Sequence, residues 1–475
     1  MASLSNAPQV ALVILVVVLI FNLIIFVHEL GHFWAAKWRG LKIDRFQIWF
    51  GKPIWSKTVN GVQYGLGWIP AGGFVALPQM APMEAIEGGN LDREPLAPIK
   101  PIDKIIVAFA GPLFSFLLAL LAAVIVTKVG KPADTIPTTI VGSVDPTGTA
   151  AQAGLQRGDK ILAVNGNPVN VWAGTLDSVF MRTATSEGDK IEFTIDRPGT
   201  GEMKLVSGFK IPDSKWWQRR GTRSVGIGPW NERVLIASIS GENAPAKAAG
   251  LEEGDEVISV NGKAATNTFD ILALLKDNGE KPVEFVISRK GETKNITVTP
   301  KVPVVFPAGT TARPMIGVAF DDDVKEDTHI VKPSAWSQMS DSVRTMWITI
   351  SSVASPKSSI GIDQLSGPIG IAKIKFLMLM MDHPWQRILA FMVLLNINLA
   401  ILNMMPLPVL DGGHITLALL EQLKGRPVRA KLLEYVQVGF AMLLFSLMLY
   451  VTSKDLFDGV GRGGSGGPTY VFPAN

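Results

Sequence analysis

The chain has 475 residues, of which 47% are hydrophobic and only 18% are charged. This balance is too apolar for an ordinary soluble enzyme, and the net charge of +4 gives no sign of nucleic-acid binding. Cysteine is absent, which excludes disulfides and cysteine-ligated metals, so a zinc ion would need histidine and carboxylate ligands.

Four apolar segments are long enough to cross a bilayer, which takes about 20 helical residues. The first has no basic amino-terminal region and no A-x-A cleavage site, so we interpret it as a retained span and not as a signal peptide. The third is interrupted by three asparagines, and polar groups at membrane depth tend to mark function. The expected spans are residues 10–36, 104–129, 386–405 and 432–452.

The first span ends in the sequence HELGH, residues 28–32, which is an H-E-x-x-H motif. On a helix, His28 and His32 share one face, separated by roughly 6 Å of rise, so both imidazoles can bind one zinc ion. Glu29 lies beside them and can take a proton from the attacking water. The motif alone is weakly specific, but three ionisable residues inside an apolar span need a partner, and a metal ion is the natural one.

Residues 41–78, between the first two spans, alternate polar and apolar side chains around Asn60-Gly61, which is typical of a β-hairpin. We expect these strands to lie against or inside the membrane. An exposed edge there would add an extended substrate as a further strand. We assign this role to the stretch from Gly67 to Ala71 and to Gly72, Gly73 and Phe74.

Basic residues follow the first span and recur between the third and fourth spans. The positive-inside rule places both loops in the cytoplasm, so both termini and residues 130–385 would lie outside, in a periplasm-like space. The basic residues are Lys37, Arg39, Lys42, Arg45, Lys52, Lys57, Lys424, Arg426, Arg429 and Lys431.

The outer segment contains an internal repeat: AGLQRGDKILAVNG at Ala153 to Gly166 returns as AGLEEGDEVISVNG at Ala249 to Gly262. Repeats of this size indicate two copies of one small domain, and the string resembles bacterial PDZ domains. We place the copies at 138–220 and 221–302. The pair would bind the C-termini left by an earlier cut, or would exclude substrates with bulky outer domains. The expected carboxylate-binding loop, Val225, Gly226 and Ile227, is assigned to the second copy, and no equally clear loop precedes the first.

Two further segments have less specific patterns. Residues 333–352, within the linker 303–385, show helical spacing of apolar residues with flanking tryptophans. They would form a helix at the membrane interface or a helix packed on the second repeat. The glycine-rich tail 463–475 is interpreted as a flexible linker with a short appendage, either native or artificial in origin.

A third metal ligand is expected in NMMPLPVLDG, residues 403–412, at the cytoplasmic end of the third span. Its two prolines break the helix, and irregular backbone at this depth is tolerated where it lines a wet cavity. Asp411 would bind the metal and leave the fourth position open for water. The alternative is a helix end at which Asp411 caps the next helix.

HELGH in the first span, NMMPLPVLDG in the third and the tandem PDZ-like repeats resemble the bacterial site-2 protease family over essentially the whole chain apart from the tail. This resemblance implies that His28, His32 and Asp411 bind zinc, with Glu29 as catalytic base. It implies that Asn403 holds the substrate or its oxyanion. Asn398 has a related polar position or forms a hydrogen bond between helices. Ala110-Gly111-Pro112 matches a family Gly-Pro motif, and Ser115 is assigned packing only.

The expected fold is a multi-pass α-helical membrane protein with four transmembrane helices, membrane-associated β-hairpins and two periplasmic PDZ-like α+β domains. The resemblance implies a zinc endopeptidase of the bacterial inner membrane, with its metal near the cytoplasmic side. It would cleave single-span proteins, such as an anti-sigma factor or remnant signal peptides, after an earlier cut. The rival interpretations are a non-enzymatic PDZ adaptor and a metalloprotease for soluble peptides. Iron or cobalt would suit the same histidine and carboxylate ligands, and zinc is preferred by analogy with the family.

Overall fold

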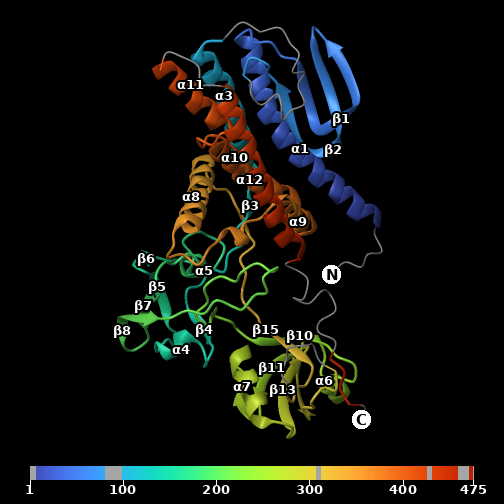
Figure 1. Ribbon diagram of the computed structural model, residues 1–475. Coiled ribbons are helices and arrows are strands. Elements are labelled where there is room, and N and C mark those ends of the chain that lie inside the picture. The colour runs from blue at the N-terminus through green and yellow to red at the C-terminus, as the bar shows by residue number, and fades with distance from the viewer. Residues whose placement is uncertain (1–6, 81–98, 306–311, 425–429, 458–469, 474–475) are drawn as a thin grey trace. The chain divides into compact units, whose positions relative to one another are not determined.

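The computed structural model describes residues 7–80, 99–305, 312–424, 430–457 and 470–473. The chain divides into two compact units, and each is described by itself (Figure 1). Unit 1 comprises residues 1–132, 330–349 and 366–452, and unit 2 comprises residues 133–329, 350–365 and 453–475. Most of the second basic loop, residues 425–429, lies outside the described residues, as does part of the tail.

Unit 1 is mainly helical and contains one long hairpin. Its elements are α1 (Ala7–Trp38), β1 (Arg45–Val59), β2 (Val62–Ala76), α3 (Pro101–Val129), β3 (Lys131–Pro132), β16 (Ile330–Val331), α8 (Ala335–Ala354), α9 (Pro368–Met380), α10 (Pro384–Asn403), α11 (Asp411–Lys424) and α12 (Ala430–Phe457), of which α8 and α12 continue past the boundary of the unit.

Four helices of the described chain are long and apolar enough to cross a membrane, as the sequence predicts. They are Val10–Trp38, Pro101–Val129, Pro384–Asn403 and Tyr435–Phe457. In α3, small residues allow close packing: Ala119, Ala122 and Ala123 are buried in one core with Ile24 of α1 and with residues of α10. Close backbone approach through small residues is the usual way in which membrane helices associate.

The predicted hairpin forms around Asn60-Gly61, where both residues have positive φ and Val59 pairs with Val62. The register brings four segments side by side, in the order 73–76, 45–48, 63–66 and 55–59. Residues 73–76 and 55–59 are therefore the two outer edges of this small sheet.

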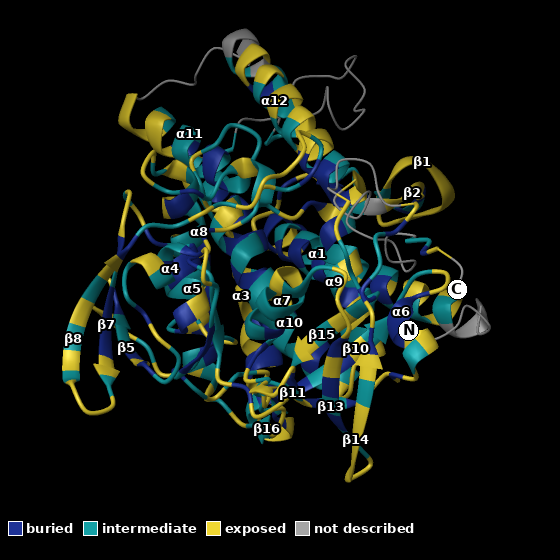
Figure 2. Ribbon diagram, turned by 90° about the horizontal axis from the view of Figure 1, so that it is seen from below, coloured by how far each residue is buried: buried dark blue, intermediate teal, exposed yellow. Residues whose placement is uncertain are grey.

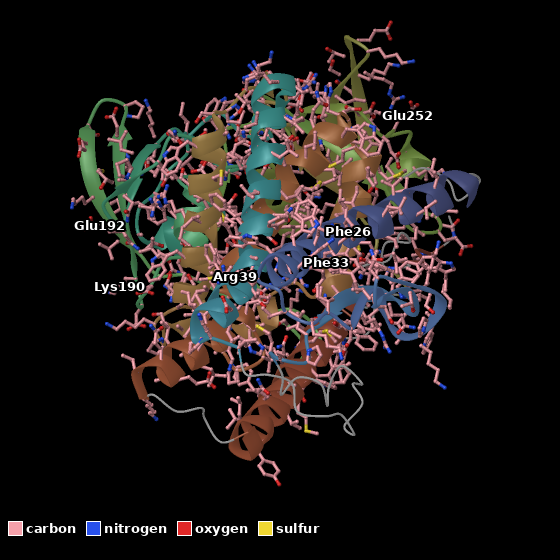
Figure 3. The ribbon with its side chains drawn as sticks, turned by 90° about the horizontal axis from the view of Figure 1, so that it is seen from above. Phe26, Phe33, Arg39, Lys190, Glu192 and Glu252 are labelled. Atoms are coloured by element: carbon pink, nitrogen blue, oxygen red, sulfur yellow. The ribbon has the colours of Figure 1, made fainter. Side chains whose placement is uncertain are left out.

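Aromatic packing attaches the hairpin to α1. Phe26 and Phe33 of α1 contact Phe46 of β1 edge-on, with ring centroids 5.8 and 5.3 Å away, and both α1 rings are labelled in Figure 3. At the end of α1, Arg39 Nε donates a hydrogen bond of 2.7 Å to Asp103 in the first turn of α3. These contacts fix the hairpin beside the helix that carries the H-E-x-x-H motif.

Helix α8 corresponds to the predicted amphipathic segment, and within unit 1 it packs against α3 and α10. Gln338 Nε2 donates to the Ala123 carbonyl oxygen at 3.1 Å, and Met339 lies in the core shared by α3 and α10. Trp336 and Trp347 remain 79% and 70% exposed. A location of α8 at the membrane interface stays a prediction.

Unit 2 contains the two repeat domains. The first has β4 (Val141–Val144), α4 (Thr149–Gln152), β5 (Lys160–Val164), β6 (Asn167–Pro168), α5 (Val179–Ala184), β7 (Ile191–Arg197), β8 (Gly201–Ser207) and β9 (Ile227–Pro229). The second has β10 (Val234–Ile239), α6 (Pro245–Ala249), β11 (Glu256–Val260), β12 (Lys263–Ala264), α7 (Thr268–Asn278), β13 (Val283–Arg289), β14 (Glu292–Val298) and β15 (Val318–Asp322), and a 3-10 helix, η1, follows at Ile362–Gln364.

Each repeat domain has its own core. Phe193 and Phe285 occupy corresponding places on β7 and β13, and both are fully buried. The outer strands β8 and β14 are largely exposed (Figure 2). The burial pattern therefore supports two small, separate cores, as the internal repeat predicts.

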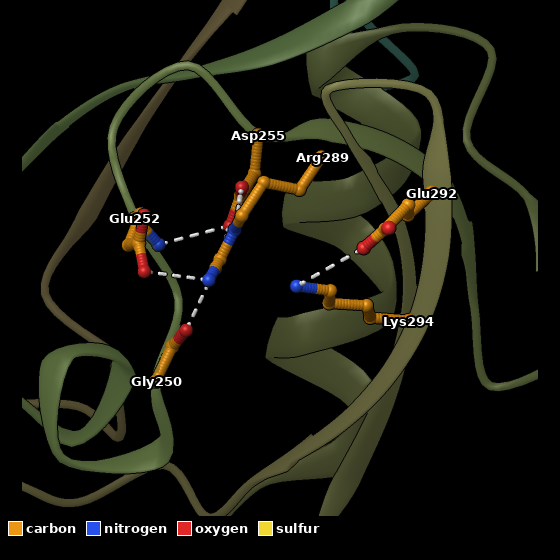
Figure 4. Close-up of polar contacts among 6 residues, drawn as sticks. All are labelled: Gly250, Glu252, Asp255, Arg289, Glu292 and Lys294. Atoms are coloured by element: carbon orange, nitrogen blue, oxygen red, sulfur yellow. Dashed lines mark hydrogen bonds and ion pairs between the residues drawn. The ribbon is translucent and has the colours of Figure 1, made fainter.

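The repeats also share a buried ion pair next to the Gly-Asp turn. In the second domain, Arg289 donates from Nε and Nη2 to both carboxylate oxygens of Asp255 at 2.7 and 2.8 Å, and from Nη2 to the Gly250 carbonyl oxygen at 2.8 Å (Figure 4). In the first domain, Arg197 makes the same contacts with Asp159 and with the Gly154 carbonyl oxygen. A two-pronged arginine–carboxylate bond of this kind fixes the turn that begins β5 and β11.

The boundaries expected for the repeats are wrong. Val225 is buried in the core of the first domain, and β9 pairs with β4, so Val225, Gly226 and Ile227 belong to the first copy. In the first copy, the Ala150 N–H donates to the Val225 carbonyl oxygen at 3.0 Å. In the second copy, the Ala246 N–H donates to the Ile316 carbonyl oxygen, also at 3.0 Å. The matching loop of the second copy is therefore the stretch that begins at Ile316 and leads into β15. Each repeat is completed by a strand that follows its hairpin, so residues up to 322 belong to the second domain.

The described part of the tail is not a free appendage. Residues 470–472 form backbone hydrogen bonds to the second repeat domain, and Phe472 is only 1% exposed. Residues 470–472 of the expected flexible tail are therefore packed on this domain.

Candidate metal centre

Helix α1 presents His28 and His32 one turn apart on the same face. Their rings lie nearly perpendicular, with centroids 4.9 Å apart, and their Nε2 atoms are separated by 3.3 Å. Glu29 lines the same cavity, where its Cγ lies 3.5 Å from the position that a Cβ on Gly73 would take. The spacing of the motif thus places both imidazoles on one face of α1.

Asp411 is brought to the histidines by a tight turn after α10. A Cβ on Gly412 would lie 2.3 Å from the Met404 carbonyl oxygen, and one on Gly413 would lie 2.1 Å from that of Leu407. Only glycine allows the chain to double back so closely before α11 begins at Asp411. Its Oδ2 lies 3.3 Å from His28 Nε2, and its Oδ1 lies 3.3 Å from His32 Nε2.

These three side chains lie close enough together to hold one metal ion, and their spacing fits a tetrahedral zinc ion. Ligand bonds of about 2.0–2.1 Å at the tetrahedral angle place neighbouring ligand atoms roughly 3.3 Å apart. The Nε2 atoms of His28 and His32, 3.3 Å apart, match this value, and each lies 3.3 Å from a different oxygen of Asp411. One ligand atom from each of the three residues lies within 4.8 Å of the other two. Asp411 Oδ2 is also buried without a hydrogen-bond partner in the described part of the chain, as expected for an atom that faces a metal ion.

The electrostatics agree with a ligand role for Asp411. Burial would raise the pKa of its carboxyl group, but in the metal-free site the two neighbouring imidazoles, when protonated, hold that pKa below its usual range. The side chain is therefore a carboxylate, which is the form that binds zinc.

Each histidine is oriented by a bond to its other ring nitrogen. His32 Nδ1 lies 2.8 Å from the Val107 carbonyl oxygen of α3, so Nδ1 carries a proton, and Nε2 is the atom that a metal would bind once Nε2 has lost its own proton. His28 Nδ1 lies 3.0 Å from Ser115 Oγ, and Ser115 is fully buried. The assignment of Ser115 to packing alone is therefore wrong. A single serine in an apolar span has no spacing that would have revealed this contact.

Replacing Ser115 with alanine should weaken zinc binding by about tenfold, because partners that orient metal-bound histidines typically contribute 10–100-fold in affinity. Zinc affinity measured by competition with a fluorescent chelator would show the change. Ser342→Ala is a suitable control, since it removes another buried helical hydroxyl that donates to Gln338 at 2.8 Å. Equal affinities in the two variants would exclude the orienting role.

A cavity of about 990 Å³ opens from the three ligands. Of the residues predicted to hold substrate, Gly72, Gly73, Phe74 and Asn403 line it. Asn403 Nδ2 lies 3.4 Å from His28 Nε2.

Two of the predicted substrate residues, Gly67 and Asn398, are not part of the cavity lining in the described chain. A Cβ on Gly67 would lie 2.3 Å from the Phe50 carbonyl oxygen, so this glycine permits close strand pairing. Asn398 Oδ1 is buried without a hydrogen-bond partner among the described residues.

His414 also lines the cavity, although it is not among the residues predicted from the sequence. Burial lowers the pKa of its imidazole, which favours the neutral form. Its position one turn after Asp411, in the continuous sequence LDGGH, is the signal that would have identified it.

The arrangement defines a membrane-embedded metallopeptidase, and comparison with known proteins agrees. The family model "Peptidase family M50" matches residues 16–446, and the chain belongs to this family. It is therefore a protease.

Several curated relatives match along nearly their whole length. The chain is similar to "Regulator of sigma-E protease RseP" of Salmonella typhimurium strain 14028s, with 29% identity over 91% of this chain and 95% of the relative. It is similar to a "Putative zinc metalloprotease" of Vibrio cholerae, with 29% identity over 92% and 97% of the two chains. The RseP protein of Escherichia coli K12 is 28% identical over 90% and 94%.

Proposed function

We propose that this protease uses zinc to cleave the transmembrane segments of single-span proteins within the bacterial inner membrane. The observation that carries the proposal is the position of the three ligands. His28 and His32 lie inside the apolar helix Val10–Trp38, and Asp411 follows shortly after the apolar helix that ends at Asn403. A protease for soluble peptides would not need its metal ligands on membrane-spanning helices.

The side chains around the cavity have distinct roles in peptide hydrolysis. Zinc, when bound by His28, His32 and Asp411, would polarise the peptide carbonyl and make water acidic enough to deprotonate near pH 7. Glu29 would take the proton of the attacking water and pass it to the leaving amine. Asn403, which lies beside His28, would donate a hydrogen bond to the developing oxyanion.

The hairpin would hold the substrate in an extended form. A peptide carbonyl inside an intact helix is hydrogen-bonded and shielded, so the segment must unwind before it is cut. Residues 73–76 pair with 45–48, and no strand of the described residues pairs with their other side. Gly72, Gly73 and Phe74 line the cavity at this outer edge. Added as a strand here, the substrate backbone would pass beside Glu29.

Phe74→Pro should therefore reduce cleavage of a single-span substrate at least tenfold without loss of zinc, because proline removes a backbone donor and distorts the edge. The matched control is Thr58→Pro on the opposite outer edge, which should cleave like the wild type. Both variants would be assayed in detergent, with zinc measured by atomic absorption. Wild-type cleavage by Phe74→Pro would rule out strand addition at this edge.

We further propose that the two repeat domains are PDZ-like, lie on the periplasmic side and exclude substrates with large outer domains, so that cleavage follows an earlier cut. Anti-sigma factors and remnant signal peptides are the proposed substrates, and the C-termini left by the earlier cut are proposed ligands of the PDZ-like domains. This topology rests on the basic loops that follow the first span and precede the fourth.

The structure offers a clean way to test this exclusion. Pro132 and Ile330 are cross-strand partners in β3 and β16, so residues 133–329 can be replaced by an Asn-Gly turn. The shortened protein should cleave substrates that retain a bulky outer domain, whereas the intact protein should cleave only the trimmed form. If both proteins cleaved only the trimmed substrate, the repeat domains would not be what excludes substrates with large outer domains.

A further inference from the structure

The described C-terminal segment, Tyr470 to Phe472, is held in unit 2 by two isolated β-bridges at Val471. In Figure 1 it is the red segment near C, beside α6 of the second repeat domain. Val471 is bridged on one side to Glu242, in the loop after β10, and on the other side to Val305, which follows β14. The segment therefore lies between two parts of the domain that are more than 60 residues apart in sequence.

Backbone hydrogen bonds are made on both edges of this segment. Towards β10, Glu242 N–H donates to the Tyr470 carbonyl oxygen at 2.9 Å, and Phe472 N–H donates back to Glu242 at 3.0 Å. Towards β14, Val304 N–H donates to the Val471 carbonyl oxygen at 2.8 Å, and Val471 N–H donates to Val305 at 3.1 Å. A strand paired on both sides is recognised mainly through its backbone, and its side chains supply selectivity.

The side chain that supplies selectivity is Phe472. Its ring lies so close to two glycines that a Cβ on Gly241 would be 2.7 Å from Cε2, and one on Gly317 would be 3.3 Å from the same atom. Both glycines have positive φ, so the backbone itself forms the slot that accepts the ring. Gly317 belongs to the loop that leads into β15.

The first repeat domain has no such slot among its described residues. Gly226 corresponds to Gly317, but the space beside it is occupied by Asp145, whose Cβ lies 3.0 Å from a Cβ built on Gly226. The aromatic slot is thus a specific property of the second domain, although both domains share the same loop hydrogen bond.

We propose that the second repeat domain carries a strand-binding site for extended peptide segments with an aromatic residue at the third position, and that Tyr470 to Phe472 is its tethered ligand. The site is formed by residues 241–242, 304–305 and 317. This site is not a groove along β15, because the bound segment forms its backbone hydrogen bonds with residues 242 and 304–305 and not with β15. A covalently tethered ligand competes with any free peptide of the same pattern. This proposal does not depend on the proteolytic function.

Peptide binding tests the site directly. A fluorescent peptide with the sequence of residues 468–475 should bind saturably to the otherwise complete chain that lacks residues 470–475. It should bind at least tenfold more weakly to the intact chain, whose site is occupied. Two modified peptides should also bind the shortened chain with at least tenfold lower affinity. One carries Phe472→Ala. The other has N-methyl valine at 471, which removes the N–H that donates to the Val305 carbonyl oxygen. Equal binding to the two chains, or of the three peptides, would overturn the proposal.

A second measurement, amide hydrogen exchange, uses the complete chain, so its result does not depend on whether the shortened chain folds correctly. In Phe472→Ala, the amides of Glu242 and Val304, which donate to the tail, should exchange at least tenfold faster than in the wild type. The amides of Phe285 and Ile287 in β13, which lie in the domain core, should keep their rates. Unchanged exchange at Glu242 and Val304 would show that Phe472 does not hold the segment in place.

Discussion

Asp411→Asn should leave the protein almost free of zinc and lower the cleavage rate by about 10³-fold or more. The carboxylate supplies one of three ligand atoms, and its two oxygens each lie 3.3 Å from a histidine Nε2. A neutral amide is a poor ligand for zinc, and loss of the metal removes several kcal/mol of transition-state stabilisation, at about 1.4 kcal/mol for each tenfold in rate. Zinc content and cleavage of a single-span substrate would be measured on the same preparation.

Asp103→Asn provides the control for this prediction. Asp103 is another buried carboxylate of unit 1, paired with Arg39 at the start of α3 and not part of the ligand group. Its replacement should leave zinc content unchanged. If Asp411→Asn also kept one zinc per chain and cleaved normally, Asp411 would not be a ligand.

Gly111→Ala should lower zinc affinity and cleavage by at least 100-fold, although alanine favours helices by up to about 1 kcal/mol over glycine. The added Cβ would lie 2.1 Å from His32 Nε2, the atom placed for the metal, so the imidazole must leave its position. The same substitution at Gly439 of α12 is a matched control, because no atom lies within 4 Å of its Cβ position. Thermal unfolding would show whether both variants stay folded. Normal zinc binding by Gly111→Ala would contradict the close packing of α3 on the histidines.

The local parts of the metal centre are predictable from sequence, because helical periodicity alone puts His28 and His32 on one face. The approach of Asp411 is predictable only through the motif around it. The packing of α1 against α3 cannot be predicted from the sequence. Ser115 and Gly111 act through contacts with residues about 80 positions away, and a serine or glycine in an apolar helix has no local pattern that reveals them.

The repeat domains show the same limit in another form. The strings at Ala153 and Ala249 identify two copies, but strand order is a non-local property. The loop at Val225 precedes the second string in sequence and completes the first domain in space. Similarly, glycine-rich composition near the C-terminus indicates a flexible linker with a short appendage. It does not reveal that Phe472 is buried, because Gly241 and Gly317, which leave room for its ring, are distant in sequence.

The central claim, that this site hydrolyses peptide bonds in membrane segments, is tested most directly by comparing wild type with Glu29→Gln. Cleavage of a single-span substrate in detergent and zinc content would be measured for both. The geometry predicts one zinc per chain in each protein and a loss of about 10²–10⁴-fold in cleavage for Glu29→Gln, the usual contribution of a general base. Equal cleavage by the two zinc-loaded proteins would show that Glu29 is not the base and that the chemistry takes place elsewhere.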